Sequence, residues 1–242
     1  MPSFVDLIDI RSRTVANYRL LRAVTQTLDG LIETETEKAL RKVAFRSAVG
    51  KLAGIKDPFS YSAVPDLARA FHRLSSPDPD ETRYADLKYR FRPFVWSSFF
   101  VSAYSILEHC LLDYSDSIAH FYQMSDVHEE SGNGVVRSRA YLAEVAGVEI
   151  PNSWGKLTWY PKVRNCLTHA GGRVADSTKA KSLLPYVERE RHLSLDARGY
   201  LQIGQEYVLT AIDSMESFVV DLDVAVKLRT DALFSQMYAK AT

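Results

Sequence analysis

The segment Arg164-Asn165-Cys166-Leu167-Thr168-His169 contains the residue types that phosphodiester chemistry needs. An arginine supplies a permanent, forked cation that can hold phosphate oxygens, and a histidine can exchange protons near neutral pH. In a helix, a separation of five residues turns the two side chains about 140° apart with a rise of ~7.5 Å. We therefore expect Arg164 and His169 to flank one groove, where one holds a phosphate and the other transfers a proton.

Local signals predict the elements that position these residues. Pro161 is compatible with the first turn of a helix, and Gly171-Gly172 favours its end, so KVRNCLTHA is predicted to be a short helix that carries both Arg164 and His169. Downstream, HLSLD and YLQIG alternate apolar and polar residues around Ala197-Arg198-Gly199. This pattern predicts a short hairpin with a glycine in its turn, and it is the only convincing strand signal.

The remaining pattern after residue 92 is helical. Pro93 precedes the most apolar part of the chain, which predicts one long core helix over 94–122. A further helix fits 135–146 and closes at Gly147, a position where a left-handed glycine is expected. The last helix is predicted from about Gln205 to Val226, with an apolar stripe that packs on the core helix.

The N-terminal third has its own periodicity. Apolar residues recur at helical spacing over 4–28, and again over 40–52, with Asp29-Gly30 as a possible end of the first helix. These stretches are interpreted as a helical hairpin or as one bent rod.

A change of composition follows over 56–82, where proline, serine and aspartate gather around a short helix predicted over 67–74. The chain is therefore divided into an N-terminal helical extension with its connector, 1–92, and a helical domain, 93–242.

Composition and charge restrict the class of protein. Apolar residues make up 46% and charged residues 25%, as in soluble globular proteins. Thirty basic and thirty acidic residues cancel, so any nucleic-acid site must be local. The only two cysteines, Cys110 and Cys166, are expected to be reduced thiols, and no cysteine or histidine spacing predicts a metal site.

Targeting and membrane segments are not expected. Asp6 and Asp9 interrupt the stretch that a secretion signal would need to be apolar. The most apolar segment, 94–112, includes several serines, Glu108 and His109, which a membrane span would not carry cheaply. A cytoplasmic protein is therefore predicted, with the apolar segment as a buried helix.

RNCLTHAGG resembles the R-N-x-x-x-H signature of the HEPN superfamily, with a polar residue after the arginine and small residues after the histidine. SAYSILEHCLLDY resembles the second HEPN helix, in which Glu108 matches a frequently acidic position. The resemblance covers roughly 93–226 and not the first ninety residues. It implies an all-α, HEPN-like antiparallel helical bundle with a short β-hairpin before the last long helix.

For function, the resemblance implies metal-independent endoribonuclease activity without a cofactor, in which the RNA 2′-hydroxyl attacks the phosphate. Arg164 would stabilise the phosphate, His169 would act as general acid or base, Asn165 would orient the phosphate, and Glu108 would support the pair. It further implies a homodimer through the motif helix and, by family habit, a toxin or antiphage effector with a cognate antitoxin or regulatory protein.

Structural interpretations compete with each functional one. His169 can interact with the carbonyls that end its helix, Arg164 can form a surface ion pair, and Glu108 can pair with Arg164 simply to fix the helix. The aromatic residues Trp154, Trp159 and Tyr160 are interpreted as core rather than as base-stacking groups.

At the level of the whole protein, two alternatives remain open. One is a noncatalytic HEPN-like dimer that binds RNA or protein. The other is a helical adaptor whose N-terminal helices carry the partner site.

Overall fold

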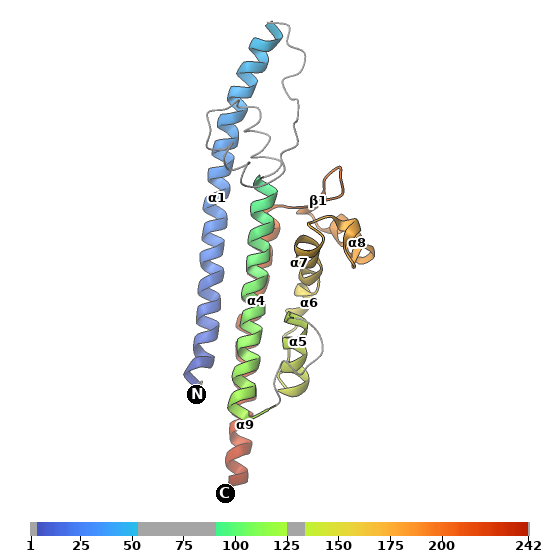
Figure 1. The fold of residues 1–242 in the computed structure, drawn as a ribbon. Helices are drawn as coiled ribbons and strands as arrows, with labels where there is room; N and C mark the ends of the chain where they lie inside the picture. Colours follow the sequence, from blue (N-terminus) through green and yellow to red (C-terminus); the bar gives the residue numbers. More distant parts are fainter. Residues whose placement is uncertain (1–3, 53–90, 125–133, 242) are drawn as a thin grey trace.

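The computed structural model describes residues 4–52, 91–124 and 134–241 (Figure 1). These residues are mostly helical, with one two-stranded antiparallel hairpin before the last helix, which confirms the coarse fold class expected from the sequence. The helix predicted over 67–74 lies outside the described residues. The body of the structure consists of three long helices: α1 (Phe4–Leu52), α4 (Arg92–Tyr122) and α9 (Gln205–Ala241).

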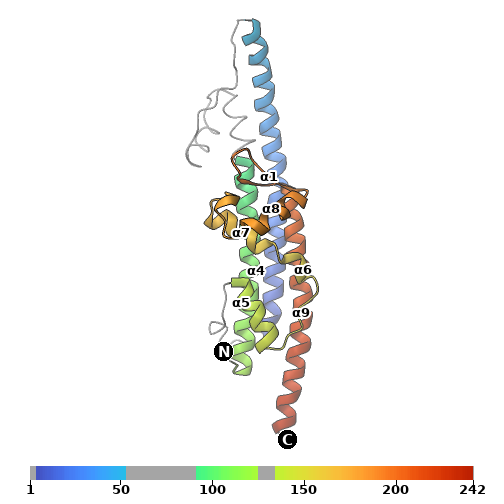
Figure 2. The same ribbon diagram turned by 90° about the vertical axis from the view of Figure 1, so that its right-hand side faces the viewer.

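The three long helices lie side by side (Figures 1 and 2). α4 and α9 run in the same direction, since Phe100 packs on Tyr207 near their beginnings and the Tyr122 hydroxyl donates to the Thr230 carbonyl further along. α1 runs in the opposite direction (Figure 1). The predicted packing of the last helix on the 94–122 helix is therefore confirmed, and α9 continues fifteen residues beyond the predicted end at Val226, to Ala241.

Shorter elements form a layer along one side of α4 (Figure 1). The helix predicted over 135–146 is present as an α-helix followed by a π-helical turn, and Gly147 follows it with the expected left-handed φ of 68°. The elements of this layer, in chain order, are α5 (Gly134–Ala140), η3 (Tyr141–Val145), α6 (Trp154–Leu157), α7 (Tyr160–His169), η4 (Val174–Asp176), α8 (Ala180–Arg189), β1 (Leu193–Leu195) and β2 (Leu201–Ile203).

The hairpin has the predicted position and turn. β1 and β2 pair antiparallel, with Leu193 opposite Ile203, and Gly199 adopts a left-handed φ of 79° in the connecting turn. α8, by contrast, is a helix that the sequence analysis does not predict. It contains Pro185, which usually interrupts a helix, and it persists with its apolar residues Leu183 and Val187 buried against the rest of the protein.

α1 corrects the expectation that Asp29-Gly30 ends the first helix. The helix continues through both residues as one element, so the hairpin interpretation is wrong. A glycine inside a helix costs only about 1 kcal/mol, and packing on both sides outweighs this cost because Thr25 and Ile32 are buried. Asp29 also accepts a hydrogen bond from Arg92 at the start of α4, at 2.8 Å.

α4 is the central helix of the structure. By length and composition it is also the one helix among the described residues that is apolar enough to cross a membrane. In this structure α1 and α9 pack along it, and α5 and α7 contact it from the side. Its role as a buried core helix is thus as expected, while the cytoplasmic location stays a prediction.

α1 contributes to the same hydrophobic core as α4 and α9. Ile10, Tyr18 and Ile32 are buried within one cluster that also includes the core residues of the other two helices. The Tyr18 hydroxyl donates to the Ala103 carbonyl of α4 at 3.2 Å. The domain boundary predicted after residue 92 stays a prediction, but the N-terminal helix is packed as part of the bundle.

The packing of α1 can be tested with two neighbouring residues. Tyr18→Ala should lower the free energy of unfolding by about 3 kcal/mol or more, because it removes a fully buried ring and leaves a cavity. Leu20→Ala, at a side chain that is 65% exposed, should change it by less than about 0.5 kcal/mol. Urea unfolding followed by circular dichroism measures both. Equal, small effects would show that α1 does not pack on α4.

Candidate active site

α7 carries the predicted motif as one helix. Pro161 lies in its first turn, and Gly171 and Gly172 follow its end with left-handed φ angles of 55° and 84°. The prediction that Arg164 and His169 share one helix is therefore confirmed. The left-handed conformations explain the two glycines, since a side chain would strain the backbone at either position.

α7 buries one face and leaves the other open. Tyr160, Val163 and Cys166 are buried against the core. This face fixes the rotation of the helix, so Arg164 is half-buried and Asn165 and His169 are exposed. The motif side chains therefore lie at the border between the core and solvent.

Arg164 and His169 are in direct contact, which corrects the expectation that they flank a groove. Arg164 Nη1 lies 3.2 Å from His169 Nε2, and the same nitrogen donates to Asn165 Oδ1 at 3.0 Å. The backbone separates the two residues as predicted, but the long arginine side chain spans the last turn. A guanidinium can only donate hydrogen bonds, so this contact is a hydrogen bond when Nε2 is the unprotonated ring nitrogen and accepts through its lone pair.

Glu108 of α4 lies on the other side of the guanidinium. Its Oε2 is 3.7 Å from Arg164 Nη2, and both side chains are 25% exposed. The carboxylate also fits closely against Gly134 at the start of α5, where a Cβ atom would overlap Glu108 Oε1. Glu108 thus occupies the position in which it can orient the arginine, as one of the structural interpretations expects.

Tyr104 joins this cluster, and the sequence analysis does not identify it. It is buried on α4, one turn before Glu108. Burial raises the pKa of its phenol above the ordinary value; the charge of Glu108 raises this pKa further, and Arg164 lowers it. The i,i+4 spacing from Glu108 was the only signal in the sequence that pointed to it.

His109, adjacent to Glu108, points elsewhere. It is exposed, and its Nδ1 lies 2.7 Å from the Ser105 carbonyl of the preceding turn. In the described part of the chain, no group of three histidine, cysteine, aspartate or glutamate side chains has an arrangement that could hold a metal ion.

The aromatic residues before the motif pack within the protein, as the structural interpretation expects. Trp159 stacks on Tyr186, with ring centroids 4.7 Å apart, and Tyr160 packs edge-to-face on Phe100. Trp154 lies against Phe218. These rings hold the start of α7 against the bundle and so support the motif indirectly.

Comparisons with known proteins leave the site to be judged by its geometry. No protein-family model, curated protein or solved structure matches the chain. The resemblance to HEPN proteins accordingly stays a prediction. What the structure provides is a cluster of Arg164, Asn165, His169 and Glu108, with a cation, an amide, an imidazole and a carboxylate in contact.

The two cysteines lie outside this chemistry. Both are free and buried, and burial raises the thiol pKa of Cys166 to about 11 and that of Cys110 to about 12. At pH 7.5, iodoacetamide should label neither thiol in the folded protein during the time in which it fully labels the urea-unfolded chain, because a buried neutral thiol is a poor nucleophile. Mass spectrometry of the alkylated peptides measures this. Rapid labelling of Cys166 in the folded protein would instead make it a candidate nucleophile.

Proposed function

We propose that the chain is a metal-independent endoribonuclease of the HEPN type. The observation that supports this most is the contact between Arg164 Nη1 and His169 Nε2, because it places a phosphate-binding cation beside a proton-transfer group. Asn165 accepts a hydrogen bond from the same guanidinium, and the exposed side chains of Asn165 and His169 border it on the solvent side, where a substrate can approach.

Each residue of the cluster has a distinct role in this reaction. Arg164 binds the scissile phosphate and stabilises the charge that develops on its oxygens. His169 transfers protons, and Asn165 orients the phosphate. Glu108 is a positioning residue, since it contacts the arginine from the core side and holds the guanidinium in place.

The reaction transfers the phosphate within the RNA strand. The 2′-oxygen attacks the adjacent phosphorus and gives its proton to a base, the bond from phosphorus to the 5′-oxygen breaks, and that oxygen receives a proton from an acid. The products are a 2′,3′-cyclic phosphate and a free 5′-hydroxyl. DNA lacks the attacking hydroxyl and is not a substrate.

A homodimer supplies the second histidine that such a reaction uses. In a two-fold dimer through α7, the exposed residues Asn165, Thr168 and His169 of two copies face each other. One His169 then acts as base and the other as acid, and two copies of Arg164 give a locally positive cleft on a chain of zero net charge.

The biological setting is proposed from the habit of the HEPN superfamily alone. On that basis we place the protein among cytoplasmic toxins or antiphage effectors that cut cellular RNA. By the same family habit, its regulator is a cognate antitoxin or another regulatory protein.

The central test is cleavage of total RNA and of a defined single-stranded RNA in EDTA. Wild-type protein should leave cyclic phosphate ends. His169→Ala should lower the cleavage rate by at least about a hundredfold, the usual loss for a missing proton-transfer group. Arg164→Ala should lower it by at least about a hundredfold as well, the usual loss for a missing group that stabilises charge in the transition state. Gel electrophoresis and end-group analysis measure both quantities.

Matched controls come from the same region. His109→Ala removes an exposed histidine next to Glu108, and Arg173→Ala removes an exposed arginine just after α7 that pairs with Asp176. Both should cleave like wild type. If no variant cleaves any RNA class while all are folded and dimeric, the chain is a noncatalytic binding protein and the proposal is wrong.

The role of Glu108 is tested separately. Glu108→Gln should slow cleavage by about two- to fivefold, because a partly exposed ion pair contributes less than about 1 kcal/mol. The same change in an Arg164→Lys background should cause no further loss, since the forked guanidinium is already absent. An additional hundredfold loss in that background would identify Glu108 as a catalytic residue rather than a positioning residue.

A further inference from the structure

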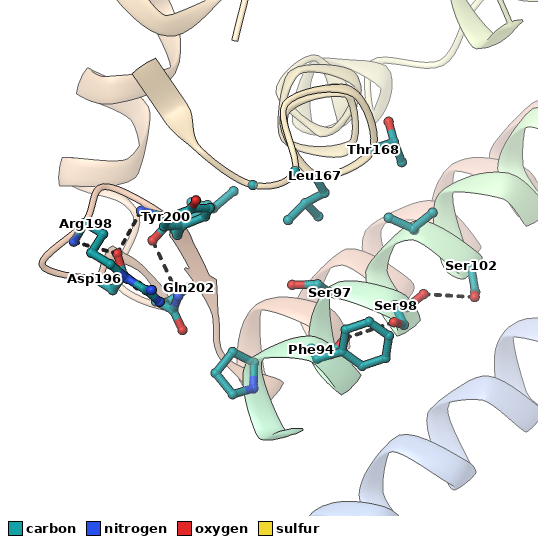
Figure 3. A pocket seen from close by; sticks show the side chains of 15 residues that line it. Phe94, Ser97, Ser98, Ser102, Leu167, Thr168, Asp196, Arg198, Tyr200 and Gln202 are labelled. Atoms are coloured by element: carbon teal, nitrogen blue, oxygen red, sulfur yellow. Dashed lines mark hydrogen bonds and ion pairs between the residues drawn. The ribbon is translucent and has the colours of Figure 1, made fainter. Parts of the chain in front are cut away.

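A groove of about 660 Å³ lies next to the motif, between the first turns of α4, the end of α7 and the hairpin. Figure 3 shows Phe94 and Ser97 of α4 on one side, Leu167 of α7 above, and Tyr200 and Gln202 of the hairpin across the opening. The volume falls within the usual range of small-ligand sites, roughly 300 to 1,000 Å³.

Backbone hydrogen bonds tie the hairpin wall of the groove to the motif helix. The N–H of Leu201 donates to the Gly172 carbonyl at 2.8 Å, and the N–H of Val174 donates to the Gly199 carbonyl at 3.1 Å. Both bonds join the hairpin to the residues that directly follow α7. The shape of the groove is therefore coupled to the position of the motif.

The lining combines aromatic rings and uncharged polar groups with one ion pair, between Arg198 and Asp196 at 3.6 Å. Phe94 is 47% exposed at the groove, and the guanidinium of Arg198 lies 5.3 Å from the centroid of the Tyr200 ring. Asp196 accepts the backbone N–H groups of Arg198 and Tyr200, so its carboxylate is committed to the turn. The Ser98 hydroxyl donates to the Phe94 carbonyl, which leaves its oxygen available as an acceptor.

These are the features that recognise an unpaired nucleobase. A base stacks on aromatic rings and on guanidinium planes, and its edge exchanges hydrogen bonds with hydroxyl and amide groups. A wholly apolar lining would suit a protein side chain or a lipid better. The lining instead offers serine and threonine hydroxyls and the Gln202 amide beside the rings.

The groove reaches the candidate active site along α7. Thr168 lines the groove, lies one helical turn from Arg164, and donates to the Arg164 carbonyl at 3.0 Å. One turn corresponds to a rise of ~6 Å, a distance that a neighbouring nucleotide of an extended strand can span. A strand whose phosphate contacts Arg164 can thus place a neighbouring nucleotide at the Thr168 edge of the groove, which Phe94 also lines.

We propose that this groove is a base-binding subsite for single-stranded RNA, adjacent to the phosphate held at Arg164. This inference rests on the proposed function, because RNA is taken as the ligand from the proposed ribonuclease activity. It adds that the enzyme selects its cleavage site through the nucleotide that stacks between Phe94 and the hairpin.

The test measures binding rather than cleavage. All proteins carry His169→Ala, so that the RNA stays intact, and the probe is a short fluorescein-labelled single-stranded RNA followed by fluorescence anisotropy at one fixed salt concentration. Phe94→Ala should weaken binding about tenfold, as expected for the loss of one stacked base. Phe234→Ala is the matched control, because Phe234 is an exposed phenylalanine of nearly equal exposure, 49%, on α9.

A second probe distinguishes the contribution of the base to binding from that of the phosphates. In a series of RNAs that each lack the base at one position, one RNA should bind equally to the Phe94→Ala protein and to its parent with Phe94. In that RNA the Phe94 ring has no base to stack on, so removing the ring has no effect. Equal binding of the intact RNA by both proteins would overturn the subsite and leave the cleavage results unaffected. Binding that depends on Phe94, without cleavage by the wild type, would support the subsite and refute the ribonuclease.

Discussion

The structure depends on covering α4, which is apolar around most of its circumference. Buried positions recur along the whole helix, so it cannot lie at the surface as an amphipathic helix does. α1 and α9 cover it along its length, and the layer of short elements covers what these two leave open. The buried residues of α4 are Val95, Trp96, Phe100, Ala103, Tyr104, Leu107, Cys110, Leu111, Tyr114, Ser115 and Ile118.

Within this apolar contact, a few polar groups fix the register of the helices. Asp223 of α9 is buried, and its two oxygens accept hydrogen bonds from the Tyr114 hydroxyl and from Lys227. A buried carboxylate without such partners would be costly. The bond from Tyr114 therefore holds α4 against α9, while Lys227 pairs with Asp223 within α9. Glu108, on the same helix as Tyr114, faces α7, where it contacts Arg164. The geometry of the candidate site thus derives from the packing of the bundle.

Local signals in the sequence were sufficient for much of the fold. Pro93 lies in the first turn of the core helix, Gly171 and Gly172 follow the end of the motif helix, and Gly199 lies in the hairpin turn. Each of these conformations is decided by the residue and its immediate neighbours. The same reasoning was wrong at Gly30, and it did not predict the helix around Pro185. In both places burial of neighbouring apolar residues outweighs a modest local preference, and burial depends on parts of the chain distant in sequence.

For the candidate site, the sequence by itself determined that Arg164 and His169 lie on one short helix that ends in glycine. Only the tertiary structure decided how their side chains meet. Their contact depends on the rotation of α7 on the core and on the reach of a long side chain, which backbone spacing does not specify. Tyr104 and the groove beside Phe94 likewise arise where α4, α7 and the hairpin meet. Contacts between such distant elements are set by the summed burial of many apolar residues, and no local sequence pattern specifies them.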